Sequence, residues 1–149
     1  MAGLTDLERT MIEWRCSQLV ARFALLNDAY DYDNMALTFT EDAVFTRPTM
    51  PDKVMQGRQA IMDQFRSRPA RTLRHLMANT VITVESAERA TGVCYMILYA
   101  GPPLAQGEKG PPLTDQAPMI GAFRDVFVKV GEQWLFAERR GELGLTVKT

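Results

Sequence analysis

Four long segments rich in β-branched and aromatic residues fill the second half of the chain and constrain its fold most strongly. They cover residues 71–84, 89–100, 119–130 and 133–141, and a tight turn signal around Gly131 joins the last two. Helical patterns precede them in the first half. Helices followed by a run of long antiparallel strands favour an α+β fold over an alternating α/β fold.

The chain begins with the pattern of a long helix. "TDLE" at Thr5–Glu8 fits a capping box, in which the threonine hydroxyl and the glutamate each satisfy a free backbone N–H. The apolar residues behind it recur at spacings of four and three: Ile12, Cys16, Leu19, Phe23 and Leu26. This spacing predicts one face of an amphipathic helix that ends near Asn27–Asp28.

Two shorter helices and a short strand are expected next. Asp31 or Asp33 can cap a helix that carries the apolar residues Met35, Leu37 and Phe39. Residues 41–48 predict a strand that stops at its terminal proline. Residues 58–68 follow Gly57 and predict a third helix, which closes before Pro69.

A Gly/Pro-rich connection, residues 101–118, joins two of the long strands. It is unusually long for a hairpin, so we expect either a functional lid or a tolerated surface insertion. The whole chain, residues 1–149, is expected to form one domain with its core in roughly residues 5–142.

The composition excludes several classes of protein. Hydrophobic residues make up 46% and charged residues 23%, an ordinary globular balance. A net charge of -1 lacks the electrostatic footprint of a nucleic-acid binder. One histidine and two distant cysteines, Cys16 and Cys94, cannot build a usual zinc site, so no metal is expected.

The compartment can be predicted from the same composition. Both cysteines fall in apolar segments, which suits buried, reduced thiols. The first 15 residues hold no continuous apolar stretch that would predict a signal peptide, and no run approaches the length of a membrane span. We therefore expect a cytoplasmic protein without membrane contact.

Five acids lie between residues 25 and 45, and one of them stands apart. Asp31 and Asp33 are explained as caps, and the pair at positions 41–42 as a solvated turn before a strand. Asp28 directly follows the apolar helix. Its side chain would point into the sheet if the helix ended at the rim of the sheet. The only histidine, His75, lies near the start of a predicted strand, where a lone histidine is often a core or rim residue bonded to the backbone.

The order and spacing of several segments carry a family resemblance. They are "DAYDYDNMALTFTEDAVF" at 28–45, "VMQGRQAI" at 54–61, "RHLMAN" at 74–79 and "FRDVFVKVGEQWLFAERR" at 123–140. Together they resemble the SnoaL-like domain of the nuclear transport factor 2-like (cystatin-like) superfamily. The resemblance implies an α+β cone, in which a long N-terminal helix and two short helices pack on a strongly curved, mostly antiparallel sheet around an apolar pocket.

The resemblance is nearest the scytalone dehydratase and dehydrochlorinase branch, whose enzymes pair an Asp at the end of the first helix with a His on a strand. Carried onto this chain, those positions fall on Asp28 and His75. The histidine would be the general base and the carboxylate would fix its tautomer. The implied activity is proton abstraction from a small hydrophobic molecule by a cofactor-independent lyase, isomerase or cyclase. A second histidine and the tyrosines of the scytalone dehydratase pattern are missing, which argues against that particular dehydration.

Helper residues are candidates for binding the substrate. Tyr95 and Tyr99 share one strand face and Met96 lies on the other, so either face can line the cone. Of two neighbouring arginines only one can point inward, where it would stabilise negative charge or clamp a carboxylate. The full set of candidates, each with core packing as the alternative, is Trp14, Phe45, Tyr95, Tyr99, Phe123, Arg139 and Arg140.

Asp125 lies on a predicted strand and has two interpretations: an inward acid of the ketosteroid isomerase kind, or an acid at an interface or rim. The rival for the whole protein is a non-catalytic ligand-binding or assembly module, such as the small subunit of a ring-hydroxylating dioxygenase. In either case the outer sheet face needs cover, and the alternating segment 123–130 is a candidate self-complementary patch. We expect a homodimer or homotrimer.

Overall fold

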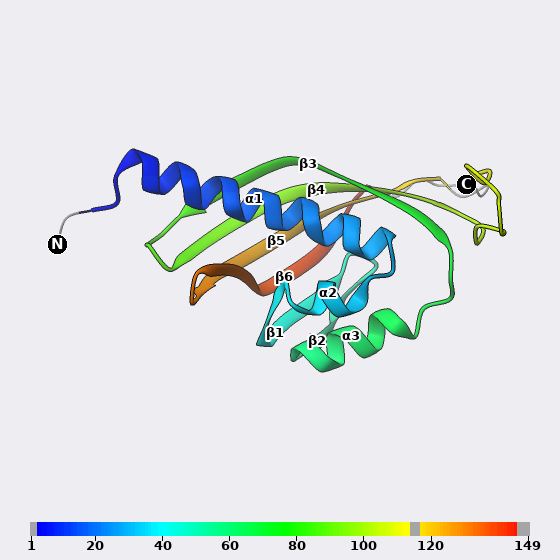
Figure 1. Ribbon diagram of the computed structural model, residues 1–149, viewed down its shortest axis with the longest axis horizontal. Coiled ribbons are helices and arrows are strands. Elements are labelled where there is room, and N and C mark those ends of the chain that lie inside the picture. Colours follow the sequence, from blue (N-terminus) through cyan, green and yellow to red (C-terminus); the bar gives the residue numbers. More distant parts are fainter. Residues whose placement is uncertain (1–2, 114–116, 146–149) are drawn as a thin grey trace.

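The computed structural model describes residues 3–113 and 117–145 and has three helices and one six-stranded sheet in those residues. Figure 1 shows the long first helix lying across the strands. The elements in chain order are α1 (Asp6–Asp28), α2 (Tyr32–Ala36), β1 (Phe39–Arg47), β2 (Met50–Gln56), α3 (Arg58–Arg66), β3 (Thr72–Val84), β4 (Arg89–Gly101), β5 (Met119–Val130) and β6 (Gln133–Leu145).

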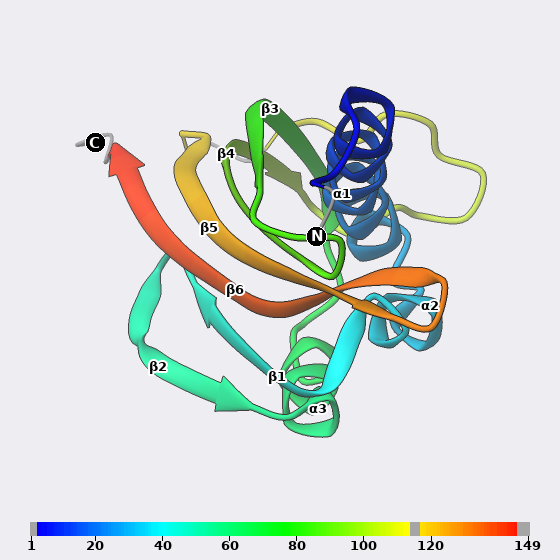
Figure 2. The same ribbon diagram turned by 90° about the vertical axis from the view of Figure 1, so that its left-hand side faces the viewer.

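The sheet confirms the predicted α+β class. Its strands follow the order β2-β1-β6-β5-β4-β3, and only β1 and β6 run parallel. Figure 2 shows that the sheet is strongly curved, with the three helices on its concave side. The concave side therefore holds the core of the protein.

Helix α1 forms as its sequence predicts. Thr5 and Glu8 make the complete capping box, and the helix ends at Asp28. Near its end, Phe23 packs its ring against four others, those of Phe39, Phe45, Phe65 and Phe136, at centroid distances of 5.7 to 6.3 Å. These aromatic contacts fix the C-terminal half of α1 to the sheet and to α3.

The region after α1 differs in two ways from the prediction. Phe39 opens β1 instead of belonging to the second helix, because it pairs with Phe136 of β6 and is fully buried there. The strand β2 was not predicted. It lies at the edge of the sheet and is almost wholly exposed, so it carries no apolar alternation. Asp31, one of two candidate caps, accepts from the backbone N–H of Asn34 and caps α2.

The connection after β4 returns toward the sheet at both of its ends. The carbonyl of Pro102 accepts bonds from the backbone N–H and the hydroxyl of Thr72 at 3.2 and 2.7 Å. A Cβ on Gly101 would lie 2.8 Å from the carbonyl oxygen of Pro112, so a glycine is needed for this close approach. The predicted lid or insertion, residues 101–118, includes residues 114–116, which lie outside the described residues.

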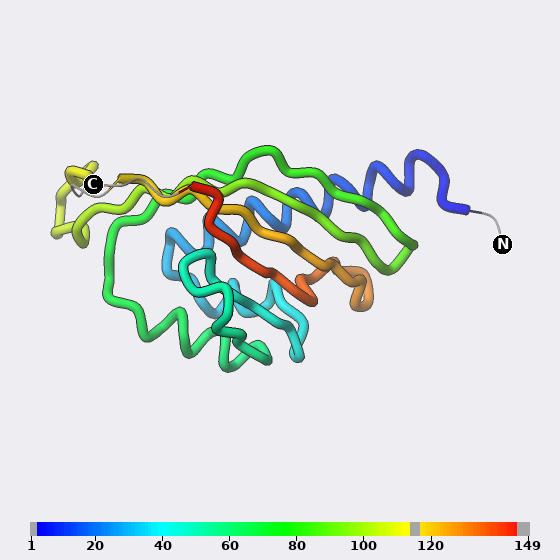
Figure 3. Tube along the Cα trace, turned by 180° about the vertical axis from the view of Figure 1, so that it is seen from behind, coloured from blue at the N-terminus to red at the C-terminus, as the bar shows by residue number. Residues whose placement is uncertain are grey.

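Alternation along β3 and β4 gives the sheet two different faces. Met96 and Leu98 face the helices, whereas Tyr95 and Tyr99 lie on the convex face. Seen from behind in Figure 3, the convex side of the described chain carries no helix. The segment 123–130 does not supply an aromatic patch to this face, because its two phenylalanines are buried in the concave core.

None of the helices in the described part of the chain has the length and apolar character needed to cross a membrane.

Candidate active site

Asp28 and His75 meet at the junction of α1 and β3. Oδ1 of Asp28 lies 2.5 Å from Nδ1 of His75, and its other oxygen, Oδ2, accepts the backbone N–H of His75 at 2.9 Å. Both side chains are largely enclosed, with exposed fractions of 10% for the aspartate and 8% for the histidine. A carboxylate only accepts, so Nδ1 of His75 carries the proton of this bond, and whenever the ring is neutral Nε2 keeps its lone pair.

The local sequence brings these two residues together. Because β3 is an edge strand, the backbone N–H of His75 has no partner strand on its outer side, and Asp28 at the end of α1 takes that place. Tyr30 adopts a positive φ of 57° and turns the chain just after the helix. Its hydroxyl donates to the carbonyl of Arg71 at 2.9 Å and accepts the N–H of Arg71 at 2.8 Å. These two hydrogen bonds to the chain just before β3 hold the end of α1 against the strand.

His75 lines a cavity of about 140 Å³ between α1 and the concave face of the sheet. Most of its wall is apolar, and the aromatic and aliphatic lining residues are Phe23, Ala24, Phe45, Pro48, Phe65, Met77, Met96, Leu98, Met119 and Phe123. Since Asp28 holds Nδ1, Nε2 is the ring nitrogen left for a molecule in this cavity. The cavity is smaller than the few hundred Å³ of a typical drug-sized pocket.

Four polar side chains other than His75 also line this cavity: Asn27, Arg47, Thr49 and Arg68. The sequence reasoning did not select any of them. Arg47 follows the inward-facing Phe45 by two positions on β1, so strand alternation alone could have placed it inside. Arg68 lies in the connection between α3 and β3, where no periodicity indicates direction.

Two of the predicted substrate-binding residues, Phe45 and Phe123, line the cavity, and four others lie elsewhere. Trp14 is 57% exposed on the outer side of α1, and Tyr95 is 52% exposed on the convex face. Tyr99 also lies on the convex face. Arg140 points outward and pairs with Glu138 at 2.9 Å. The structure does not bring these four to the dyad, and we do not propose them as substrate contacts.

Arg139 is the inward member of the arginine pair, yet it does not line the cavity. It is fully buried behind the cavity wall, with its guanidinium carbon 4.7 and 4.2 Å from the ring centroids of Phe23 and Phe123. Its Nη1 lies 3.4 Å from Oδ2 of Asp125. Asp125 is therefore an inward acid as one interpretation held, although it is held in the core beside an arginine rather than in the cavity.

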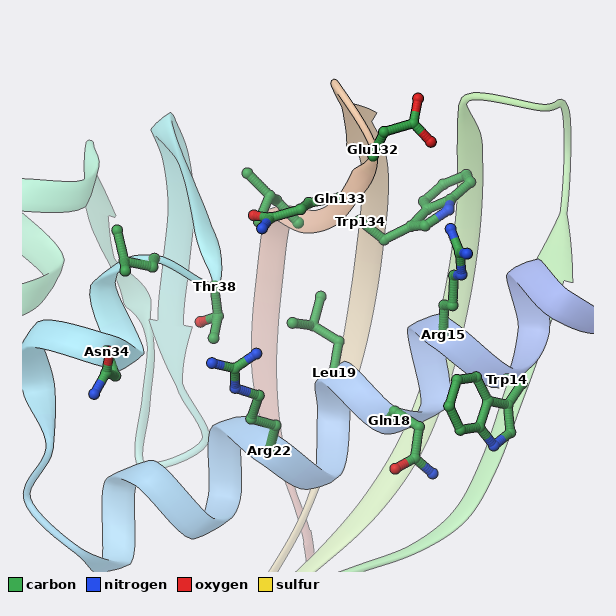
Figure 4. Close-up of a pocket in the computed structure, with 12 residues that line it drawn as sticks. Trp14, Arg15, Gln18, Leu19, Arg22, Asn34, Thr38, Glu132, Gln133 and Trp134 are labelled. Atoms are coloured by element: carbon green, nitrogen blue, oxygen red, sulfur yellow. The ribbon is translucent and has the colours of Figure 1, made fainter.

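A second and larger hollow, of about 370 Å³, lies on the other side of α1, facing the turn between β5 and β6. Figure 4 shows Arg15 of the helix pointing toward Trp134 beside that turn and Arg22 pointing toward Thr38, whereas Arg15 separates Trp14 from Trp134. Of the helix side chains here, Leu19 is buried and the others are exposed, and the hollow contains neither Asp28 nor His75. This groove is larger than the cavity beside His75, but the imidazole of His75 lies in the smaller cavity.

In the described ranges 3–113 and 117–145, no three His, Cys, Asp or Glu side chains are grouped so that they could hold a metal ion. Cys16 and Cys94 are free and buried, as their apolar surroundings in the sequence predict.

Sequence comparison assigns the chain to a family. Residues 8–140 match the family described as the SnoaL-like domain, so this protein belongs to the SnoaL-like domain family. Its fold is the nuclear transport factor 2-like, or cystatin-like, fold. No curated protein matches the chain by sequence.

Solved structures with this fold are similar to the chain over most of its length. A candidate scytalone dehydratase from Novosphingobium aromaticivorans has a TM-score of 0.79 at 18% identity, covering 95% of this chain and 89% of that one. A hexachlorocyclohexane dehydrochlorinase has a TM-score of 0.76 at 14% identity, covering 95% and 90%. A protein of unknown function with a cystatin-like fold from Nostoc punctiforme has a TM-score of 0.71 at 19% identity, covering 98% of each chain. At these identities the similarity shows the fold alone.

Proposed function

We propose that this protein is a cofactor-independent lyase, isomerase or cyclase that removes a proton from a carbon atom of a small molecule. The observation that carries the proposal is the 2.5 Å contact between Asp28 and Nδ1 of His75, beside an apolar cavity that the imidazole lines. The fold likeness to a candidate dehydratase and to a dehydrochlorinase supports it. A cytoplasmic location belongs to the same proposal and is supported by the free, buried Cys16 and Cys94.

The chemistry follows from the two side chains. Nε2 of His75 takes a proton from an acidic carbon, and the electron pair of the broken C–H bond stays on the substrate. The imidazolium so formed is stabilised by the carboxylate of Asp28 at Nδ1. In a lyase the electron pair then expels a leaving group from the neighbouring carbon. In an isomerase His75 returns the proton to a different carbon.

Exchange of a carbon-bound proton tests the base directly. Small ketones, β-hydroxy ketones and chlorinated cyclohexanes are incubated with the protein in D2O, and the loss of the C–H signal is followed by NMR. His75→Ala should slow the exchange of an active compound by about 10²–10⁴-fold, the usual contribution of a general base. Arg74→Ala, an exposed neighbour outside the cavity, serves as the control and should leave the rate unchanged. Full exchange by the histidine variant would refute the assignment.

The variant Asp28→Asn tests whether the reaction needs Asp28 to fix the tautomer of His75, or needs only the presence of the imidazole. An amide can donate to Nδ1, which would favour the tautomer with its proton on Nε2 and remove the basic lone pair from the cavity. The exchange rate should therefore fall by about 10²-fold or more, even though the side chains are nearly the same size. An unchanged rate would show that Asp28 only anchors the strand.

A non-catalytic ligand-binding module is the second candidate, and the small volume of the cavity, about 140 Å³, favours it. This function would be favoured over the first if a compound bound in the cavity, as shown by competition with a known cavity ligand, and no tested compound exchanged its carbon-bound protons.

A further inference from the structure

Two arginines share the dyad's cavity without any carboxylate to balance them. Arg47 comes from the end of β1 and Arg68 from the connection before β3, and neither Asp nor Glu is among the residues that line the cavity. The nearby carboxylate of Asp28 is already bound to the side chain and backbone of His75. In the described residues neither arginine makes an ion pair.

The bonds that these guanidinium groups do make go to neutral oxygens. Nη2 of Arg68 donates to Oδ1 of Asn27 at 2.7 Å and to the hydroxyl of Tyr32 at 3.5 Å. Nη2 of Arg47 donates to the carbonyl of Gln64 at 3.1 Å, while its Nε is buried and has no hydrogen-bond partner in the described structure. A buried donor without a partner is costly unless a ligand completes it.

The two positive groups also lie near each other. Their guanidinium carbons are 5.8 Å (Arg47) and 4.3 Å (Arg68) from the same ring centroid, that of Phe65. They therefore cannot be further apart than the sum of these two distances. Burial, and next the positive charge of Arg68, lower the pKa of Arg47. Two unpaired cations in one partly enclosed site favour an anion between them or beside them.

We propose that this cavity binds a small carboxylate, held by Arg47 and Arg68, with the remainder of the ligand in the apolar part next to His75. The size of the ligand follows from the volume of about 140 Å³, which is close to that of a cavity that holds one benzene ring. The ligand is thus a compact carboxylic acid of about one six-membered ring. As a statement about the substrate this rests on the proposed function, but the binding site does not require turnover.

Benzoate and benzamide are suitable probes because they share a shape and differ in charge. Isothermal titration of the wild-type protein at pH 7 should give a dissociation constant for benzoate about tenfold or more below that for benzamide. Arg47→Gln and Arg68→Gln should each reduce this preference severalfold. Arg66→Gln is the matched control, since that exposed arginine pairs with Asp33 outside the cavity and should leave the preference unchanged.

The ratio of the two constants within each variant does not depend on the fraction of protein that is folded, so a destabilised variant still gives a valid result. Equal binding of benzoate and benzamide, or an unchanged preference in both arginine variants, would overturn the proposal. Failure of the proposed function is a separate result, because absent proton exchange together with an intact benzoate preference would remove only the catalytic role of His75.

Discussion

At the scale of single residues, the most unusual group outside the cavity is the buried carboxyl of Asp125. It is only 3% exposed, and its Oδ1 has no hydrogen-bond partner among the described residues. Burial raises the pKa of Asp125 to about 6, and the positive charge of Arg139 opposes that rise without cancelling it. Burial, and next the charge of Asp125, also raise the pKa of the Cys16 thiol to about 12. This thiol is therefore not a nucleophile at neutral pH.

The pKa of Asp125 predicts a particular pH dependence of stability. The folded protein holds this proton up to about pH 6, whereas the unfolded chain releases it near 3.8. The contribution of Asp125 to the free energy of unfolding should therefore fall as the pH rises from about 4 to 6 and stay low above that. The difference between the two pKa values corresponds to a change of roughly 3 kcal/mol in the free energy of unfolding. Urea unfolding of the wild type and of Asp125→Asn at several pH values measures this contribution. The other titrating groups contribute equally to both proteins, so their effect cancels in the difference. A difference that stays constant from pH 4 to 7 would contradict the raised pKa.

The sequence predicts single residues unevenly. The meeting of Asp28 and His75, which lie 47 positions apart, followed from the family resemblance and not from any local pattern. Nothing in the spacing distinguished the two faces of β4, so Tyr95 and Tyr99 were candidates although they face outward. The direction of a strand face depends on which side the helices cover, and that is a property of the whole sheet.

At the scale of elements, one tyrosine joins α1 to the start of β3. Tyr30 lies two residues after Asp28, the last residue of α1. Its hydroxyl makes hydrogen bonds to both the N–H and the carbonyl of Arg71. Arg71 lies four residues before His75, in the chain just before β3. The bonds of Tyr30 therefore form a second link between α1 and the start of β3, in addition to the bond from the backbone N–H of His75 to Asp28.

Tyr30→Phe should remove this link while keeping the ring. The backbone N–H and carbonyl of Arg71 would both lose their partner, so the free energy of unfolding should fall by about 1–3 kcal/mol. Backbone amide exchange at the start of β3 should also become faster. Urea unfolding and hydrogen exchange measure these effects, with Tyr99→Phe as the control, since that partly exposed tyrosine makes no such bond. Equal stability of the two variants would show that solvent replaces the lost bonds.

Elements with their own periodicity could be predicted, and those without it could not. The capping box and the apolar spacing gave α1 its correct bounds, and the four long strands were found to within a few residues. The strand β2, with only Met55 buried, offered no such signal. The parallel pairing of β1 with β6 is a contact between the two halves of the chain, and local sequence does not encode it.

At the scale of the whole molecule, the helices cover the concave face of the sheet and leave the convex face without cover in the described chain (Figures 2 and 3). Leu76 of β3 and Tyr95 of β4 project from that face and are 50% and 52% exposed. Val81, further along β3, is 65% exposed. Exposed apolar side chains gathered on one sheet face are typical of association surfaces. We propose that a second or third copy of this chain covers them, as the sequence led us to expect.

Light scattering coupled to size-exclusion chromatography tests this association. The wild type should have two or three times the chain mass of 16.8 kDa. Tyr95→Glu places a charge on the convex face and should shift the mass toward that of one chain, because burying an unpaired carboxylate in an interface is costly. Leu25→Glu is the matched control, since Leu25 is also exposed and apolar but lies on α1. A wild-type mass of one chain would show that the convex face stays in water, and an equal loss of mass in both variants would place the interface elsewhere.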